Sequence, residues 1–179
     1  MDLRRKNLVG NLIFPMQGDR VLLGFKTKKL TIGCWNGWGG GQKDGETIRQ
    51  AAQRELEEES GFLARLEDLE YVGKVTFHNQ KSGGREFHVE VHMFLVWKWE
   101  GELKPNAEMK NPTWWPINSF PPISELMPSD PDWLPLVLRG VRIDGDAWQK
   151  WIEEPGKPVR VVKTKLSEIR KVEKLGDVD

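Results

Sequence analysis

The segment from residue 46 to residue 60 restricts the fold more than any other part of the sequence, because its charges conflict with its amphipathic pattern. At about 100° per residue, its small and aliphatic side chains fall on one stripe of a helix, formed by Ile48, Ala51, Ala52 and Leu56. A helix with such a stripe packs its apolar side against a core. The segment therefore predicts a helix that lies against a sheet or a second helix.

Residues at both ends of the segment favour a helix with defined boundaries. Thr47 and Gln50 have the spacing of a capping box, and Asp44 is an alternative N-cap. Gly61 stands where a helix ends in a left-handed residue. We expect the helix to run from about Glu46 to Ser60.

Acidic side chains interrupt the apolar stripe. Glu55 and Glu59 fall within it, and Glu58 lies at its edge. A carboxylate turned toward the interior costs several kcal/mol unless a cation or hydrogen-bond donors offset its burial. Arg54 is the sole cationic side chain between residues 50 and 61 and cannot neutralise three carboxylates. The pattern predicts a hard divalent cation, Mg²⁺, with Mn²⁺ as a substitute.

The spacing of these carboxylates also indicates a class of reaction. Residues at i, i+3 and i+4 project together from a helix. Mg²⁺ bound in this way keeps several waters and takes phosphate oxygens as further ligands. The helix therefore favours phosphoryl chemistry, in which the metal neutralises developing charge and activates water.

The remaining elements predict a mixed α+β fold. We expect a hairpin, a glycine-rich loop, a second pair of strands joined by a turn, and a second helix that starts near Pro131. In order, these are residues 8–14 with 20–25, 31–45, and 69–78 with 85–99 joined by 79–84. We interpret residues 1–179 as one domain, in which residues 141–179 have no assigned element.

Composition excludes several other classes of protein. No stretch approaches the roughly 20 apolar residues of a membrane span, and the start of the chain lacks the apolar run of a signal peptide. Because 27 basic residues balance 27 acidic ones, no general attraction to a nucleic-acid polymer is expected. The lone Cys34 suits a reducing compartment. We expect a cytoplasmic monomer.

The acidic segment resembles the Nudix box, written Gly, five residues, Glu, seven residues, Arg-Glu-aliphatic-x-Glu-Glu-x-Gly-hydrophobic. Every fixed position is filled, by Gly40, Glu46, Arg54, Glu55, Leu56, Glu58, Glu59, Gly61 and Phe62. The resemblance implies the Nudix α/β/α sandwich, with a mixed β-sheet between helices, and hydrolysis of a nucleoside diphosphate linked to another group.

The same resemblance implies roles for individual residues of the box. Glu55, Glu58 and Glu59 would bind the metal, with the Gly40 carbonyl as a further ligand. Arg54 would orient these glutamates and pair with Glu46, two helical turns away.

Outside the box, the chain is similar to the MutT homologue class of oxidised purine nucleoside triphosphatases found in animals. The similarity covers roughly residues 10–140. It rests on the segments RVLLGFKTKKLTIGCWNGWGG, VGKVTFH, EVHMF, AEMKNPTWW and MPSDPDWLPLVL, which follow one another in the same order as in that class.

This second resemblance implies a set of substrate contacts. Asn36 would hydrogen-bond the base, Asn11 would line the pocket, and Phe77 would pack against the base. Glu108 would assist with metal or water as a fourth catalytic residue beside Arg54, Glu55 and Glu58. The other residues expected to bind substrate are Lys26, Trp38, Met127, Ser129 and Asp130.

Two departures from that class bear on the base. Met127 and Ser129 stand where those enzymes have a Trp and the first of two adjacent Asp residues, so Asp130 is left as a single acidic reader. Two coupled carboxyls can exchange protonation states, an option that one Asp lacks. Gly41 stands where they carry Lys, which removes one positive charge near the box.

The sequence favours hydrolysis of oxidised purine nucleoside triphosphates, such as 8-oxo-dGTP, to the monophosphate and pyrophosphate. Two alternatives stay open. One is a hydrolase of dinucleoside polyphosphates or of other nucleoside diphosphate derivatives. The other is a non-catalytic nucleotide-binding regulatory module.

Overall fold

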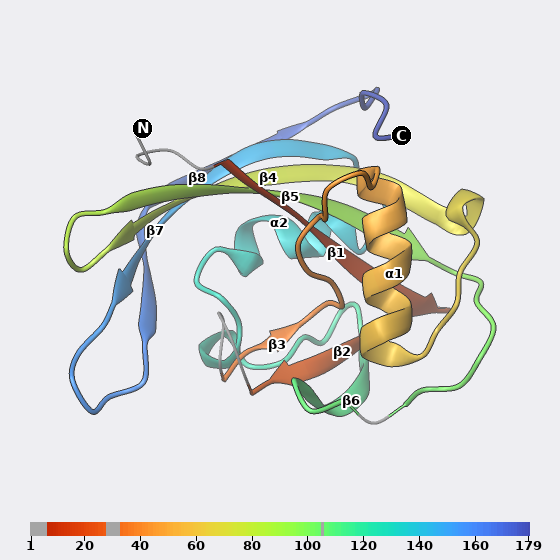
Figure 1. Cartoon of the computed structure of the whole chain (residues 1–179), viewed down its shortest axis with the longest axis horizontal. Coiled ribbons are helices and arrows are strands. Elements are labelled where there is room, and N and C mark those ends of the chain that lie inside the picture. Colours follow the sequence, from red (N-terminus) through yellow and green to blue (C-terminus); the bar gives the residue numbers. More distant parts are fainter. Residues whose placement is uncertain (1–6, 28–32, 105) are drawn as a thin grey trace.

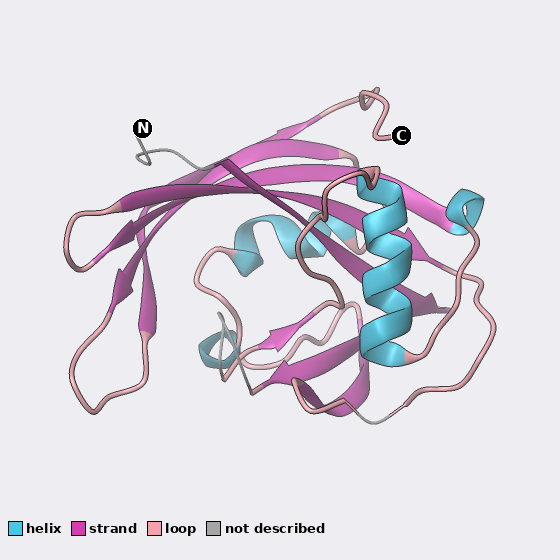
Figure 2. Ribbon diagram, in the orientation of Figure 1, coloured by secondary structure: helices cyan, strands magenta, loops and turns pink. Residues whose placement is uncertain are grey.

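The computed structural model describes residues 7–27, 33–104 and 106–179 as one curled sheet with two helices and two short 3-10 turns (Figures 1 and 2). The elements in chain order are β1 (Asn7–Gln17), β2 (Arg20–Lys26), β3 (Trp35–Asn36), α1 (Ile48–Ser60), η1 (Leu66–Asp68), β4 (Leu69–Lys81), β5 (Glu86–Val96), β6 (Met109–Pro116), η2 (Ile123–Glu125), α2 (Asp130–Val137), β7 (Ile143–Ile152) and β8 (Arg160–Lys171).

The sheet is mixed. Its strand order is β3-β2-β1-β5-β4-β7-β8, and β6 pairs with β2. The pairs β1·β5 and β4·β7 are parallel, whereas all the other pairs are antiparallel. Figure 1 shows that the long strands curve over α2 while β2, β3 and β6 lie below it. The expected α+β class with a mixed sheet is confirmed.

The two helices cover opposite faces of the sheet, as the alternation of side chains along β5 shows. Phe94 and Val96 belong to the core that α1 covers, together with Ile48 and Leu56. Met93 and Leu95 point the other way, into the core that contains Trp133 of α2. Since successive strand residues face opposite sides, the sheet lies between the helices. This arrangement is the α/β/α sandwich predicted above.

The first hairpin and the pairing of β4 with β5 are confirmed, but several element boundaries differ from the prediction. β4 continues to Lys81, so Asn79 lies within the strand and not in the expected turn, because β7 pairs with β4 as far as that point. α1 begins at Ile48, so Glu46 precedes the helix. Thr31 and Ile32, the start of the expected loop, lie outside the described residues.

The C-terminal segment, for which no element was predicted, adds β7 and β8 to the same sheet. β7 pairs in parallel with β4, with Phe77 opposite Ala147 and Asn79 opposite Gln149. The segment therefore extends the concave face on which Phe77 lies.

In the described part of the chain, no helix has the length and apolar character needed to cross a bilayer.

Candidate active site

The acidic helix α1 is fixed at both ends by its own sequence. The Gln50 N–H donates to the Thr47 hydroxyl at 3.1 Å, and the Thr47 N–H donates to the Gln50 side chain at 2.9 Å. This reciprocal pair is the predicted capping box. Gly61 closes the helix with φ +81°, and its N–H donates to the Glu57 carbonyl. The register of the carboxylates along α1 is set by these two caps.

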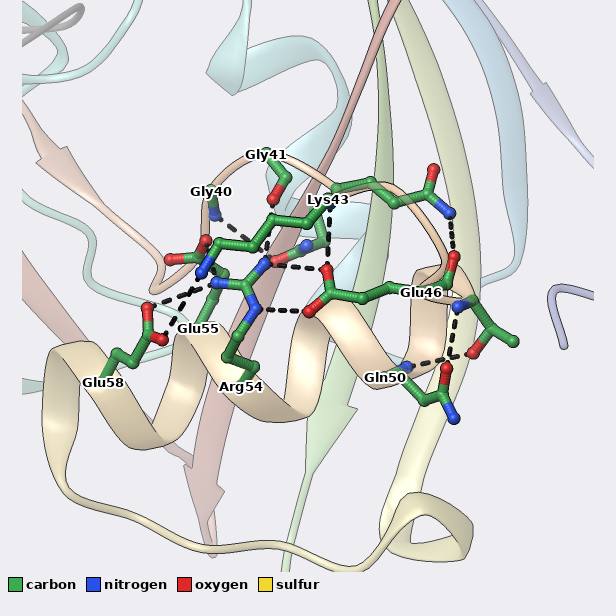
Figure 3. A network of polar contacts seen from close by, with 11 residues as sticks. Gly40, Gly41, Lys43, Glu46, Gln50, Arg54, Glu55 and Glu58 are labelled. Atoms are coloured by element: carbon green, nitrogen blue, oxygen red, sulfur yellow. Dashed lines mark hydrogen bonds and ion pairs between the residues drawn. The ribbon is translucent and has the colours of Figure 1, made fainter.

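Arg54 joins the acidic residues into one network (Figure 3). Its guanidinium donates to both carboxylate oxygens of Glu46, at 2.5 and 2.9 Å, and to Glu55 at 2.6 Å. A longer contact of 3.2 Å reaches Glu58, and another reaches the Gly41 carbonyl. The hydrogen bonds from Arg54 hold the pKa of the Glu46 carboxyl at about 2, well below its usual range. Arg54 therefore positions two of the predicted metal ligands from one side.

The glycine-rich loop lies along β1. The Asn11 N–H donates to the Gly40 carbonyl at 2.9 Å, and Ile13 exchanges two backbone hydrogen bonds with Trp38. A Cβ at Gly40 would lie 2.6 to 2.7 Å from all three carboxyl atoms of Glu55. The loop can pass this close to α1 because residue 40 has no side chain.

The three box glutamates have different environments. Glu59 is buried, and this burial raises the pKa of its carboxyl although the Gly39 N–H donates to it at 2.9 Å. The charges of Glu55 and Glu108 raise the pKa further, whereas Lys26 lowers it. Glu58 was expected at the edge of the apolar stripe, but its side chain is 54% exposed because it turns toward Arg54 and solvent. The expected burial of the carboxylates is therefore found for Glu59 but not for Glu58.

The carboxylates are not gathered around one point. Within residues 7–27, 33–104 and 106–179, no three His, Cys, Asp or Glu side chains form a ready metal cluster. Glu55 and Glu58 instead contact Arg54. The atoms along this side of α1 that could bind a metal are nevertheless oxygen atoms, the type of ligand that a hard divalent cation takes.

A cavity of about 780 Å³ begins at this helix and continues along the concave face of the sheet. Its acidic end is lined by the glycine-rich loop, Lys26, Glu55 and Glu59. Of the residues predicted to contact substrate, those that line the cavity are Asn11, Lys26, Asn36, Phe77, Met127 and Asp130.

Farther from the helix, the cavity wall is aromatic and carries one buried acid. Phe77 and Trp133 meet edge to face, with ring centroids 6.4 Å apart. Asp130 is the first residue of α2, and its carboxylate accepts a hydrogen bond from the Met127 N–H at 3.1 Å. Burial raises the pKa of Asp130 to about 7, so this acid is partly protonated near neutral pH.

Trp38 and Ser129, which were expected to bind substrate, are not among the described residues that line the cavity. Trp38 is completely buried in the α1 core, where its indole N–H donates to the Leu22 carbonyl at 3.0 Å. Ser129 is also completely buried, at the start of α2. Both side chains belong to the interior of the protein.

Sequence reasoning missed the part of the wall that β7 supplies. Gln149 and Trp151 line the cavity beside Asn79 of β4, and Trp133 of α2 was not singled out either. The alternation along β7 could have indicated a strand. Its buried positions, however, include Gly145, Ala147 and Gln149, which do not form an apolar stripe.

Comparison with known proteins identifies relatives of this chain. Residues 4–137 match the NUDIX domain. The oxidized purine nucleoside triphosphate hydrolase of Danio rerio is 40% identical over 134 residues, which are 75% of this chain and 81% of the relative. Its counterpart from Mus musculus is 37% identical over the same coverage.

The fold has a counterpart among solved structures. A MutT protein from Bacillus halodurans superposes with a TM-score of 0.64 over 86% of this chain and 97% of its own, at 21% identity. This likeness concerns the fold alone, because the identity is low.

Proposed function

Because this chain belongs to the NUDIX domain family, we propose that it is a pyrophosphohydrolase that converts oxidised purine nucleoside triphosphates to monophosphates and pyrophosphate. The observation that carries the proposal is that one continuous cavity joins the acidic helix to an aromatic wall. Glu55 and Glu59 line one end, where phosphates would lie, and Phe77 and Trp133 line the part suited to a base. The names of the two animal relatives support the choice of substrate class.

The family generally requires divalent metal ions, and we assign Mg²⁺ here, with Mn²⁺ as a substitute. The residues that would hold it are Glu55, Glu58, Glu59, Glu108 and the carbonyl of Gly40. The fit rests on their oxygen chemistry and on the close approach of Gly40 to the Glu55 carboxyl. When bound, the ion would neutralise charge on the phosphates and lower the pKa of an attacking water.

The residues of the chain itself would supply positioning and charge. Arg54 would hold Glu55 and Glu58 in place through ion pairs, since its own position is fixed by Glu46. Lys26 lies near Glu59 and lines the cavity, where an ammonium group would attract phosphate oxygens. Glu58, which is exposed and lies 3.7 Å from Lys43 of the cavity wall, would serve as the general base for water.

Base recognition would use the amides and the acid of the cavity. The side-chain oxygen of Asn36 accepts a hydrogen bond from the Gly37 N–H at 2.9 Å. Its side-chain NH₂ group therefore points away from Gly37. Asn11 has a buried NH₂ group without a hydrogen-bond partner within the described chain. Both would donate to substrate oxygens, while Asp130 would donate or accept according to its protonation. Phe77 would contact the face of the base, and Met127 would pack beside it.

A substrate panel tests the proposal. The purified protein with Mg²⁺ is expected to hydrolyse 8-oxo-dGTP faster than dGTP and to release pyrophosphate in place of orthophosphate. 2-Hydroxy-dATP, unmodified nucleotides and diadenosine polyphosphates complete the panel. Equal rates on dGTP and 8-oxo-dGTP would remove the claim about oxidised bases. Faster hydrolysis of diadenosine polyphosphates would favour that rival substrate class.

The wild type is expected to lose free energy of unfolding as pH rises toward 7, and Asp130→Asn is expected to remove this loss. Burial raises the pKa of Asp130 from 3.8 to about 7, so the folded protein holds the proton more tightly than the unfolded chain does. The free energy of unfolding of the wild type should fall relative to the variant as pH rises from about 4 to about 7, by a few kcal/mol at most. Urea denaturation between pH 5 and pH 8 measures this difference, and parallel curves would contradict a raised pKa.

We further propose that the chain acts as a single domain and as a cytoplasmic monomer on free nucleotides. The balance of 27 basic and 27 acidic residues supports a small substrate over a nucleic-acid polymer. The extension of the sheet by β7 and β8 supports treating residues 1–179 as one unit.

A further inference from the structure

The end of the cavity formed by β4 and β7 carries a pair of buried amides. Asn79 and Gln149 are register partners on these parallel strands, and their exposed fractions are 3% and 4%. Phe87 and Val89 of β5 and Trp151 of β7 line the same part of the cavity. Two amides thus stand in a largely apolar wall, where polar groups need hydrogen-bond partners.

The indole of Trp151 fixes how both amides are oriented. An indole N–H can only donate, so the Asn79 atom that it contacts at 2.7 Å is the carbonyl oxygen. The same oxygen accepts from the Gln149 NH₂ group at 2.8 Å, and the Asn79 NH₂ group donates to the Phe77 carbonyl at 2.9 Å. This arrangement leaves the Gln149 carbonyl oxygen as the one amide group of the pair without a contact.

That oxygen is fully buried and has no hydrogen-bond partner among the described residues. An unpaired buried acceptor costs free energy, which a donor on a bound ligand would recover. The other buried atoms without partners on the described cavity wall, Asn11 Nδ2 and Trp133 Nε1, are donors. Among the buried atoms without partners, the described wall therefore offers a ligand two donors and one acceptor.

We propose that Gln149 is a specificity-determining residue whose side-chain carbonyl accepts a hydrogen bond from an exocyclic amino group of the base. Gln149 is the register partner of Asn79, which lies two residues beyond Phe77 on β4. This spacing is a rise of about 7 Å on the same face of the sheet. A purine that packs on Phe77 can extend a substituent over this distance, whereas its ring edge stays near Asp130. The inference rests on the proposed function in taking the ligand to be a purine nucleotide.

Binding of nucleoside monophosphates tests this role without requiring hydrolysis. Titration calorimetry would compare two pairs that differ by one amino group, 8-oxo-dGMP with 8-oxo-dIMP and 8-oxo-dAMP with the 8-oxopurine deoxynucleotide. The wild type should bind the amino-bearing member of one pair roughly 10- to 100-fold more tightly. In Gln149→Leu, which keeps the volume but removes the acceptor, that ratio should fall to about 1.

The control is Gln53→Leu. The Gln53 amide donates to the Ala64 carbonyl at 2.7 Å, and its side chain is not among those that line the cavity in the described structure. This variant should keep the wild-type ratio. Gln149→Met provides a second variant should the leucine protein fail to fold.

Three results would overturn the proposal: no preference in the wild type, an equal preference in the Gln149 variants, or no binding of any of the four ligands. Pyrophosphate release from triphosphates is scored separately. A protein that binds with the expected ratio but releases no pyrophosphate would refute the proposed function alone. Hydrolysis of 8-oxo-dGTP without the amino preference would refute the role of Gln149 alone.

Discussion

Replacing Glu58 by Gln is expected to lower kcat for nucleoside triphosphate hydrolysis by about 10²- to 10⁴-fold, the range for removal of a positioned general base. The side chain is 54% exposed, and its ion pairs, to Arg54 at 3.2 Å and Lys43 at 3.7 Å, lie at the surface. Such pairs contribute little to stability. The variant should therefore fold as the wild type does and lose activity through chemistry alone. Steady-state kinetics with Mg²⁺ and a thermal melt measure the two quantities.

Glu57→Gln is the matched control, because Glu57 is the adjacent glutamate and projects from the other side of α1. It removes the same charge from the same helix and should leave kcat within about twofold. An unchanged rate in Glu58→Gln would exclude Glu58 as the base. A wild type that hydrolysed no substrate would instead favour the regulatory nucleotide-binding module.

Gly40→Ala is expected to have the second-largest effect, a loss of about 10²-fold in kcat, as for an ångström-scale misplacement of a catalytic group. The added Cβ would stand 2.6 Å from the Glu55 carboxyl carbon, so the carboxylate or the loop must shift. The contact of Glu55 with Arg54 at 2.6 Å would change with it. Kinetics as a function of Mg²⁺ concentration should show that a higher Mg²⁺ concentration is needed for the half-maximal rate, in addition to the slower rate.

Gly41→Ala tests whether this effect comes from the contact or from the loop in general. A Cβ at Gly41 would meet no described atom within 4 Å, and its backbone carbonyl would still accept from Arg54. We expect its kinetics to match those of the wild type. Equal losses in both variants would mean that the loop tolerates no substitution, and the specific role of Gly40 would be wrong.

The acidic end of the site could be predicted because its signals are local. Thr47, Gln50 and Gly61 determine the ends of α1, and the residues between them determine which carboxylates face inward. The pairing of Arg54 with Glu46 was expected only from the family resemblance, and the structure confirms it. The exposure of Glu58 could not be predicted, since it depends on how Arg54 turns.

The opposite end of the cavity could not be predicted because it depends on pairing between distant strands. Gln149 reaches the cavity only through the parallel register of β7 with β4. The pattern of β7 conceals this strand, since its buried face carries Gly145 and Gln149 while Trp148 lies on the other face. Trp38 was expected in the pocket but lies in the core that α1 covers. The sequence alone does not distinguish an indole in a core from one in a pocket.

The placement of β7 separates two properties along the chain. The carboxylates proposed for the reaction, Glu55, Glu58, Glu59 and Glu108, all lie within the matched NUDIX region, whereas Gln149 belongs to a strand that starts after this region has ended at residue 137. Substitutions in β7 can therefore alter which base is accepted without disturbing the chemistry. A duplicated copy of such a gene could acquire a new substrate through changes in the codons for β7 while the codons for α1 stayed unchanged.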